Sequence, residues 1–400
     1  MIKLMNLNFL QQMLTKRLLN SKCYVLRTFI LFLTLAQSQA FAAVQKQEIT
    51  INSKVVSHAL QFDVFLPDGY KNSAEIRYPI LLTSAGQSRL PILLEQVSWS
   101  SHTSFSPMPK VIIVTLPDVN LGADQDKFTG ASGELDRVTT EVLKKDVLPY
   151  VDERFNTQPF RIIEGFSSWG NLPLYVFKNS PELFNAYFVF SPALELDKTE
   201  LVRSFSGFSA DKQYRHKFLY LSLGTFAGNR DGFTKLNDVF KPQDGKNGFA
   251  FLSDDLSNIN YLSGPLIGLD TAATELFSDL NPNMERFNQS GISGLKQYYL
   301  KLEEKYGYPL DMEGGVIDLG FHFADSKKVD KALETMAHIV DHKSNNALLL
   351  IRLASVEQRA GLKNAALRTF KVALQVAQQG NDEEKISYIK NRITDLKGVN

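Results

Sequence analysis

The 400-residue sequence is poor in cysteine, because it contains only Cys23. A chain with one cysteine forms no internal disulfide, and cysteine-ligated zinc sites are excluded with it. Cys23 precedes the apolar run near the N-terminus, so it is not placed as a lipid-attachment cysteine and would leave with the leader described below. Thiolate chemistry is therefore not expected of the mature protein.

The sequence also lacks an excess of charge of either sign, with 44 Lys and Arg against 43 Asp and Glu. It contains no basic patch that would favour nucleic-acid binding. It contains no H-E-x-x-H motif, no P-loop, and no dinucleotide-binding glycine pattern after a strand. We therefore predict no cofactor, no metal site and no nucleic-acid partner.

No apolar run near the N-terminus is long enough to cross a membrane. The first 42 residues carry five cations and no acid, and include an apolar stretch at 29–36. A membrane span needs about 18 apolar residues, so the pattern predicts a signal peptide at 1–42, cleaved after Ala42. The alternative is an uncleaved anchor. We expect a periplasmic or secreted protein with no membrane span after cleavage.

Short apolar strands alternate with helical stretches over the next 200 residues. Segments 49–51 and 60–66 alternate as half-buried antiparallel strands do. Six runs rich in Ile, Leu, Val and Phe follow, at 78–82, 110–116, 160–165, 186–190, 217–223 and 248–252. Such strands, separated by helices, indicate a mostly parallel, doubly wound sheet in an α/β domain. Helices are expected at 132–155, with Pro149 ending or kinking the helix, and at 265–277.

Past Tyr308 the strand pattern stops and a helical repeat begins. Equivalent residues recur at an interval of 34: Leu319, Gly320, Ala332 and Met336 become Leu353, Ala354, Ala366 and Phe370. This period and its small residues resemble the tetratricopeptide repeat, a helix-turn-helix unit. Two such units and a final helix at 382–396 could either cap the sheet domain or bind a protein partner. We thus expect a signal peptide at 1–42, an α/β domain at 43–308 and a helical domain at 309–400.

Ser167 is the leading candidate for a catalytic side chain. It lies in Gly165-Phe166-Ser167, which joins an apolar strand to a helix. A strand that ends in G-x-S and turns straight into a helix exposes a nucleophilic hydroxyl above a parallel sheet. The backbone N–H of Ser168 would then face a developing oxyanion, with a second donor from the loop at 84–86. The alternative is an N-cap serine in an unrelated fold.

The stretches around Ser167 are similar to those of one known family. They are 64–70, 78–82, 147–155, 165–170, 181–187 and 190–192. Over about residues 48–280 the chain resembles the esterase D-like "putative esterase" family, which includes siderophore esterases and relatives of S-formylglutathione hydrolase. The resemblance implies an α/β-hydrolase fold with a Ser, Asp/Glu, His triad in that chain order. Secreted members with a C-terminal helical repeat region form a subgroup of this family.

The chain departs from the family pattern at three places. Trp169 replaces the second glycine of G-x-S-x-G, and its indole must redirect the packing or fill the pocket. Ala227 stands where the resemblance implies the triad acid, and Asn260 and Tyr261 stand where it implies the histidine. Neither Asn260 nor Tyr261 can act as the general base that imidazole provides near neutral pH.

No histidine elsewhere in the sequence is a good substitute. The six are His58, His102, His216, His322, His338 and His342. The first three favour the wrong end of the sheet, and the last three lie in the helical region. His322 is the least implausible base, although its spacing fits a helix–helix contact. The nearby acids fit solvated loop residues or helix N-caps better than a displaced triad acid; they are Asp231, Asp254 and Asp255.

Two functions remain open for the exported chain. In the first, it is a degenerate hydrolase that binds a ligand or a protein partner. In the second, it is an active serine carboxylic-ester hydrolase with a non-standard acid and base. The replacement of both triad partners favours the first, because a serine without a base is a poor nucleophile. A small-molecule ester or a related ligand is the expected partner of the Ser167 pocket, and binding of a protein partner stays one of the two alternatives for the helical region.

Overall fold

The computed structural model of the chain describes residues 45–398, apart from 73–75, 103–105, 125–132, 196–199 and 341–345. The predicted signal peptide, with Cys23, lies outside the described residues. Among the described residues no helix is both long and apolar enough to span a membrane.

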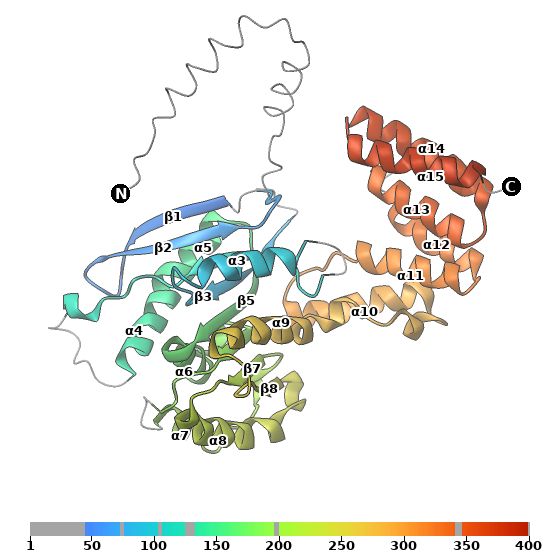
Figure 1. Ribbon diagram of the computed structural model, residues 1–400. Helices are drawn as coiled ribbons and strands as arrows, with labels where there is room; N and C mark the ends of the chain where they lie inside the picture. The colour runs from blue at the N-terminus through green and yellow to red at the C-terminus, as the bar shows by residue number, and fades with distance from the viewer. Residues whose placement is uncertain are drawn as a thin grey trace, which may run out of the picture. The chain divides into compact units, whose positions relative to one another are not determined.

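Eight strands form one sheet in the order β1-β2-β4-β3-β5-β6-β7-β8 (Figure 1). Their bounds are β1 Gln45–Asn52, β2 Ala59–Leu66, β3 Tyr78–Thr83, β4 Ile112–Thr115, β5 Thr157–Phe166, β6 Ala186–Phe190, β7 Phe218–Leu223 and β8 Ala250–Asp255. β2 pairs antiparallel with both β1 and β4, and every other pairing is parallel. The predicted mostly parallel sheet with an antiparallel opening is confirmed.

Helices cover both faces of the sheet, which explains why β3, β6 and β7 are buried along their whole length. Tyr187 of β6 meets the ring of Phe177 in α6 (Asn171–Asn179). Phe190 of the same strand lies against Gly268 in α9 (Gly264–Leu276). Side chains three positions apart on a strand point to opposite faces, so α6 and α9 cover opposite faces.

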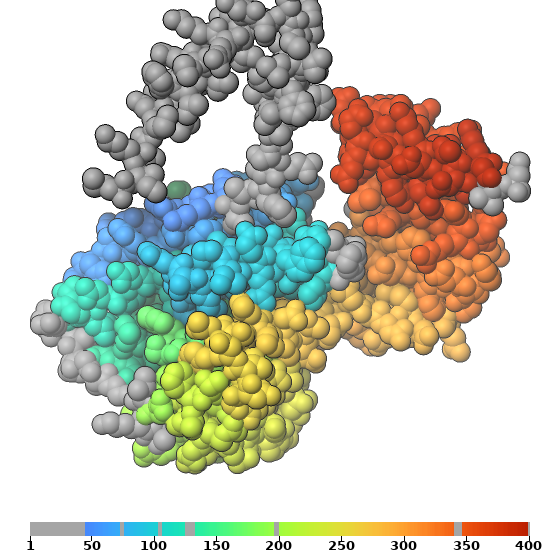
Figure 2. Space-filling model, in the orientation of Figure 1, coloured from blue at the N-terminus to red at the C-terminus, as the bar shows by residue number. Residues whose placement is uncertain are grey.

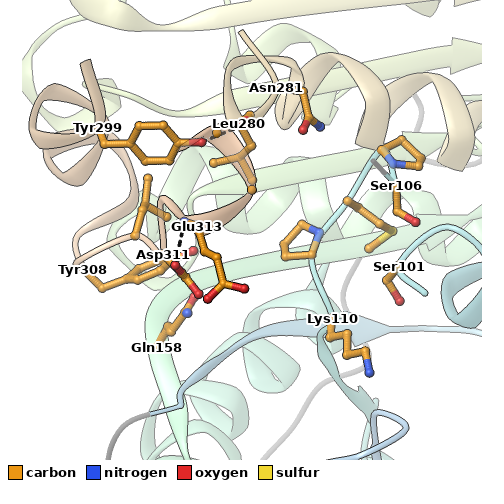
Figure 3. Close-up of a pocket in the computed structure, with 16 residues that line it drawn as sticks. Ser101, Ser106, Lys110, Gln158, Leu280, Asn281, Tyr299, Tyr308, Asp311 and Glu313 are labelled. Atoms are coloured by element: carbon orange, nitrogen blue, oxygen red, sulfur yellow. Dashed lines mark hydrogen bonds between the residues drawn. The ribbon is translucent and has the colours of Figure 1, made fainter. Parts of the chain in front are cut away.

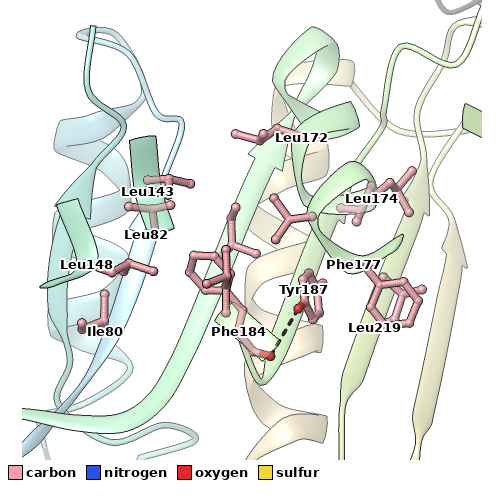
Figure 4. Close-up of a cluster of buried hydrophobic side chains, with 14 of the residues drawn as sticks. Ile80, Leu82, Leu143, Leu148, Leu172, Leu174, Phe177, Phe184, Tyr187 and Leu219 are labelled. Carbon is pink, nitrogen blue, oxygen red and sulfur yellow. Dashed lines mark hydrogen bonds between the residues drawn. The ribbon is translucent and has the colours of Figure 1, made fainter. Parts of the chain in front are cut away.

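The core between α6 and the sheet consists of large apolar side chains (Figure 4). The Tyr187 hydroxyl is buried within it and donates to the carbonyl oxygens of Phe184 and Pro181, at 3.2 and 3.1 Å. Such a bond removes most of the free-energy penalty of burying a hydroxyl. On the other face, α3 (Leu90–Trp99) and α9 lie side by side on the surface (Figure 2), and Gln96 donates to the carbonyl oxygen of Leu266 at 2.7 Å.

The helix predicted at 132–155 is present but divided. It consists of α4 (Glu134–Val142), a π-helical turn, η2 (Leu143–Val147), and α5 (Leu148–Arg154). Pro149 has no N–H with which to continue the α-helical ladder, so the ladder widens for one turn before it. Pro149 lies in the first turn of α5. It therefore interrupts the helix, which continues to Arg154. The helix predicted at 265–277 is α9.

The remaining helices follow in the second half of the chain. Their bounds are α7 Glu200–Ser204, α8 Arg230–Phe240, α10 Gly291–Tyr306, α11 Glu313–Asp325, α12 Val329–Val340, α13 Ala347–Arg359, α14 Lys363–Gln379 and α15 Glu383–Gly398. From α10 to α15, each helix packs against the next. Gly320 needs its small size, because a Cβ there would lie 2.8 Å from the Met336 sulfur. This close packing agrees with the predicted small residues, while the tetratricopeptide assignment and the boundary at 308/309 stay predictions.

Candidate active site

Ser167 lies at the carboxyl end of β5, near the middle of the sheet. Its φ is 60°, a left-handed backbone that costs a non-glycine residue on the order of 1 kcal/mol. The chain then continues through a 3₁₀ turn, η3 (Ser167–Gly170), into α6. The strand, the sharp turn and the helix leave the Ser167 side chain half-exposed at the sheet edge where α/β folds bind ligands.

Two glycines make this turn sterically feasible. A Cβ on Gly165 would lie 2.1 Å from the carbonyl oxygen of Trp169, and a Cβ on Gly170 would lie 2.9 Å from the Cα of Pro192. Gly170, one position after Trp169, is thus the residue at which the start of α6 comes close to the end of β6. The Trp169 side chain is half-buried and packs against the main core.

The loop predicted to supply the second oxyanion donor follows β3. The Ser84 amide donates to the Glu164 carbonyl oxygen at 3.4 Å, and the Ala85 amide donates to Thr83 Oγ1 at 2.9 Å. Both amides are therefore engaged within the chain, and Gly86 is the loop position whose amide we expect to face an oxyanion. Ser168 is exposed at the start of η3, and its oxyanion role stays a prediction.

A buried ion pair lies beside the Ser167 turn, and the sequence analysis missed it. Glu164, 1% exposed, accepts two hydrogen bonds from Arg89 Nη2, at 2.6 and 2.8 Å, and a further one from the Thr83 hydroxyl. The Arg89 guanidinium also lies 6.0 Å from the centre of the Phe166 ring. Glu164 is thus held in a structural ion pair and is not available as a base for Ser167. The signal in the sequence was a lone Glu within an apolar strand.

The positions implied for the triad acid and histidine carry other contacts. Ala227 is exposed in the 3₁₀ turn after β7, η6 (Ala227–Asn229). Asn260 caps η9 (Tyr261–Ser263), with its Oδ1 accepting from the Leu262 amide at 2.9 Å. The Tyr261 ring packs against Phe166, with ring centres 4.8 Å apart, and against Phe226, at 4.7 Å. The loop after β8 therefore does reach the residue next to Ser167, and it brings a phenol there.

The described histidines pair with residues other than Ser167. These pairs are His58 with Asp124, His102 with Trp99, His216 with Arg215, His322 with Asn288 and His338 with Lys296. His322 Nε2 lies 2.9 Å from Asn288 Oδ1, so its ring is engaged within the helical region. His342 lies outside the described residues.

The three nearby acids also have local partners. Asp231 accepts from Lys235 at 2.6 Å, and Asp254 accepts from the Tyr220 hydroxyl at 2.8 Å. Hydrogen bonds from Arg230 and from Ser257 lower the pKa of Asp255 to about 2. A carboxyl group with this pKa stays ionised at neutral pH, as expected for an exposed ion pair.

Ser191 provides an unpaired buried hydroxyl at the floor of this region. It follows β6, has a φ of 43° and is 1% exposed, and its Oγ has no hydrogen-bond partner among the described residues. A Cβ on Gly224, at the end of β7, would lie 2.5 Å from that Oγ and 3.0 Å from the Tyr261 ring. Ser191 lies in the family-like stretch 190–192, but no sequence pattern assigned it a role, because its environment comes from three separate strands and loops. The described residues contain no group of three or more His, Cys, Asp or Glu that could hold a metal ion.

A sequence model of the family described as "Putative esterase" matches residues 53–229. No curated protein matches the chain. The structure is similar to an IroE-like serine hydrolase from Shewanella oneidensis, with a TM-score of 0.59 and 18% identity, over 74% of this chain and 99% of that one. It is also similar to an uncharacterised protein from Capnocytophaga ochracea, with a TM-score of 0.57 and 15% identity, over 89% of this chain and 100% of that one.

The structural similarity covers more of the chain than the segment that the family model matches. The eight-stranded sheet with helices on both faces is the architecture that the resemblance implied, and an all-helical region follows it. Residues 53–229 therefore match the model of this esterase family, and the chain has an α/β-hydrolase fold.

Proposed function

We propose that this chain is an exported esterase-family protein whose Ser167 pocket binds a ligand and no longer hydrolyses esters efficiently. The observation that carries the proposal is Tyr261, which packs beside Phe166 where the family places its histidine loop. A neutral phenol already carries its proton and has no basic nitrogen like that of imidazole, so it takes up no proton from a serine. Ala227, with no ionisable group, supports the same conclusion at the acid position.

The pocket retains features that suit binding. Phe166, Tyr261 and Phe226 form a continuous aromatic row along the carboxyl edge of the sheet. The unpaired Ser191 hydroxyl and the Tyr261 ring both lie close to Gly224, and this hydroxyl would gain a partner from a polar ligand group. A small-molecule ester or a related carbonyl compound fits this combination, because the elbow amide of Ser168 would still hold its oxygen.

The second candidate is an active carboxylic-ester hydrolase, and one observation favours it. Ser167 keeps its strained φ of 60°, and such strain persists at functional sites. An oxyanion hole and binding alone leave an acceleration on the order of 10³-fold over water in serine hydrolases without a working triad. Slow turnover of activated esters is therefore expected of both candidates and does not separate them.

Fluorophosphonate labelling of the mature protein separates the two candidates. A degenerate site labels slowly, at a rate close to that of the Ser167→Ala control, because no base activates the hydroxyl. Fast labelling that depends on Ser167 would establish the active hydrolase. Introducing Tyr261→His together with Ala227→Asp gives the complementary test, since a histidine at this loop should raise the labelling rate about 10-fold or more if the elbow is intact.

Export and the role of the helical region belong to the same proposal. N-terminal sequencing of protein recovered from the cell envelope or the medium should begin at Ala43. The helical region is proposed as the partner-binding part of the chain. Pull-down with the full mature chain, and with a variant altered only at exposed positions of α14, would test it.

A further inference from the structure

A cavity lies at the opposite end of β5 from Ser167. Its volume is about 420 Å³, within the range of small-molecule sites. Gln158 at the start of β5 lines it, whereas Ser167 follows the end of that strand. At about 3.3 Å per residue, the two sites lie about 30 Å apart. The cavity is therefore separate from the candidate active site.

Two walls from distant parts of the chain form this cavity (Figure 3). One wall consists of Ser101 and the segment 106–110 before β4. The other includes Gln158, Tyr299, Tyr308 and the segment 310–315, which runs into the first turn of α11. Figure 3 shows Gln158, Asp311 and Glu313 gathered on this second wall, while the Lys110 side chain runs away from them.

Four hydrogen-bond donors along these walls are engaged within the protein. Gln158 Nε2 donates to the Arg77 carbonyl oxygen at 2.6 Å, and the Ser101 hydroxyl donates to the Val97 carbonyl oxygen at 2.7 Å. The Tyr299 hydroxyl donates to the Leu280 carbonyl oxygen at 3.2 Å, and Lys110 Nζ donates to the Asp68 carbonyl oxygen at 2.7 Å. These four donors are consequently not available to a ligand in the cavity.

The hydrogen-bond acceptors of the cavity differ from these donors, because at least one of them is unpaired. Gln158 is 8% exposed, and its Oε1 is buried without a hydrogen-bond partner among the described residues. A buried unpaired amide oxygen destabilises a fold unless a ligand or water donates to it. Asp311 adds a carboxylate to the same wall, and its Oδ1 accepts the Glu313 amide at 2.8 Å, which fixes the start of α11.

We propose that this cavity binds the guanidinium group of an organic cation. A guanidinium group carries five N–H donors in one plane, which can serve a carboxylate and the Gln158 oxygen together. Its flat face also suits the rings of Tyr299 and Tyr308, which line the same wall. The group belongs either to a small molecule or to an arginine side chain of a peptide.

Isothermal titration calorimetry on the full mature chain tests the proposal at low salt, with agmatine as the small probe. Agmatine should bind with a millimolar or tighter dissociation constant, and Asp311→Asn should weaken binding about 10-fold. This variant keeps the oxygen that accepts the Glu313 amide, so the start of α11 is preserved. Gln158→Met should weaken binding by a similar factor. Asp330→Asn, at an exposed position of α12, is the matched charge control and should leave binding unchanged.

Two further arms identify the source and the chemistry of the ligand. A blocked Gly-Arg-Gly peptide that binds at least as tightly as agmatine would assign the site to a protein partner, and weaker binding would assign it to a small molecule. Butylammonium that binds as well as agmatine would overturn the guanidinium assignment. The whole proposal is overturned if agmatine does not bind, or if Asp311→Asn and Asp330→Asn weaken agmatine binding equally. Ser167→Ala should leave agmatine binding unchanged, so failure here and failure of the hydrolase-site proposal are distinguishable.

Discussion

Gly165 leaves no room for a side chain, because a Cβ there would meet the Trp169 carbonyl oxygen at 2.1 Å. We expect Gly165→Ala to lower the free energy of unfolding by about 2 kcal/mol or more and to displace Ser167. Urea denaturation measures the first effect. Gly86→Ala is the matched control, since a Cβ at Gly86 would meet nothing within 4 Å, and it should change stability by less than about 0.5 kcal/mol. Equal loss in the two variants would contradict the steric argument.

Lys217 links stability to pH. Burial lowers its pKa from 10.5 to about 8, and its Nζ donates to the Phe184 carbonyl oxygen at 2.6 Å. Between these two pKa values the unfolded chain binds more protons than the folded chain, so the free energy of unfolding rises with pH through that window. Lys217→Met should remove a rise of roughly 1–3 kcal/mol, measured by denaturation at about pH 7.5 and pH 10. If the free energy of unfolding of Lys217→Met rises with pH as steeply as that of the exposed control Lys212→Met, Lys217 is not the source of the pH dependence.

At the residue scale, the sequence predicts a functional side chain when the residues that identify it are neighbours in the chain. Ser167 was found because Gly165-Phe166-Ser167 follows an apolar run. Ser191 and the pair of Arg89 with Glu164 were not found, because their contacts join residues far apart in the chain. Spacing along the sequence carries no information about such contacts.

The ion pair between Arg89 and Glu164 ties the start of α3 to β5, since the two residues belong to different elements. Arg89→Met leaves a buried carboxylate without its cation, and we expect a loss of about 3 kcal/mol. Adding Glu164→Gln should recover part of that loss, because an amide is neutral and still accepts from Thr83. A double-mutant cycle by urea denaturation measures the coupling, which we expect to be at least about 1 kcal/mol.

An exposed pair provides the comparison for this cycle. Lys235 and Asp231 lie four positions apart on α8, with side chains more than half exposed, and Lys235→Met should change stability by less than about 0.5 kcal/mol. If the stability losses of the Arg89 and Glu164 single variants sum to that of the double variant, the buried pair does not hold the two elements together.

At the element scale, prediction succeeds for elements whose burial is uniform. β3, β6 and β7 are buried throughout, and their apolar runs were visible in the sequence. The π-helical turn before Pro149 was not visible, because proline predicts an interruption without its form. α10 was overlooked although its buried residues recur at helical spacing, since two of the five, Tyr299 and Tyr306, are tyrosines that a count of apolar residues omits.

The predicted boundary at 308/309 divides one hydrophobic cluster. Leu295 and Tyr299 of α10 pack with Leu319 and Phe323 of α11 and are buried together. A fragment that ends at 308 would expose the α10 side of this cluster. We expect it to bind more hydrophobic dye than the full mature chain and to melt about 5 °C lower or more.

A matched variant separates this exposure from a general effect of truncation. In the fragment, Leu295→Gln should reduce dye binding, because it removes an apolar side chain that the missing helices no longer cover. In the full chain the same change should destabilise instead, because it places a polar amide in the cluster. A fragment that melts with the full chain and binds no additional dye would make 308/309 a true domain boundary.

The strand order has a consequence for how the chain assembles as it leaves a ribosome or a translocon. β1 to β4 form a half-sheet whose open edge is β3, with the apolar residues Ile80, Leu81 and Leu82 along it. This edge stays unpaired until β5 has emerged, after which β6, β7 and β8 add one by one in chain order. Unpaired apolar edges favour aggregation. We therefore expect the chain to be most prone to aggregation before Phe166 is available.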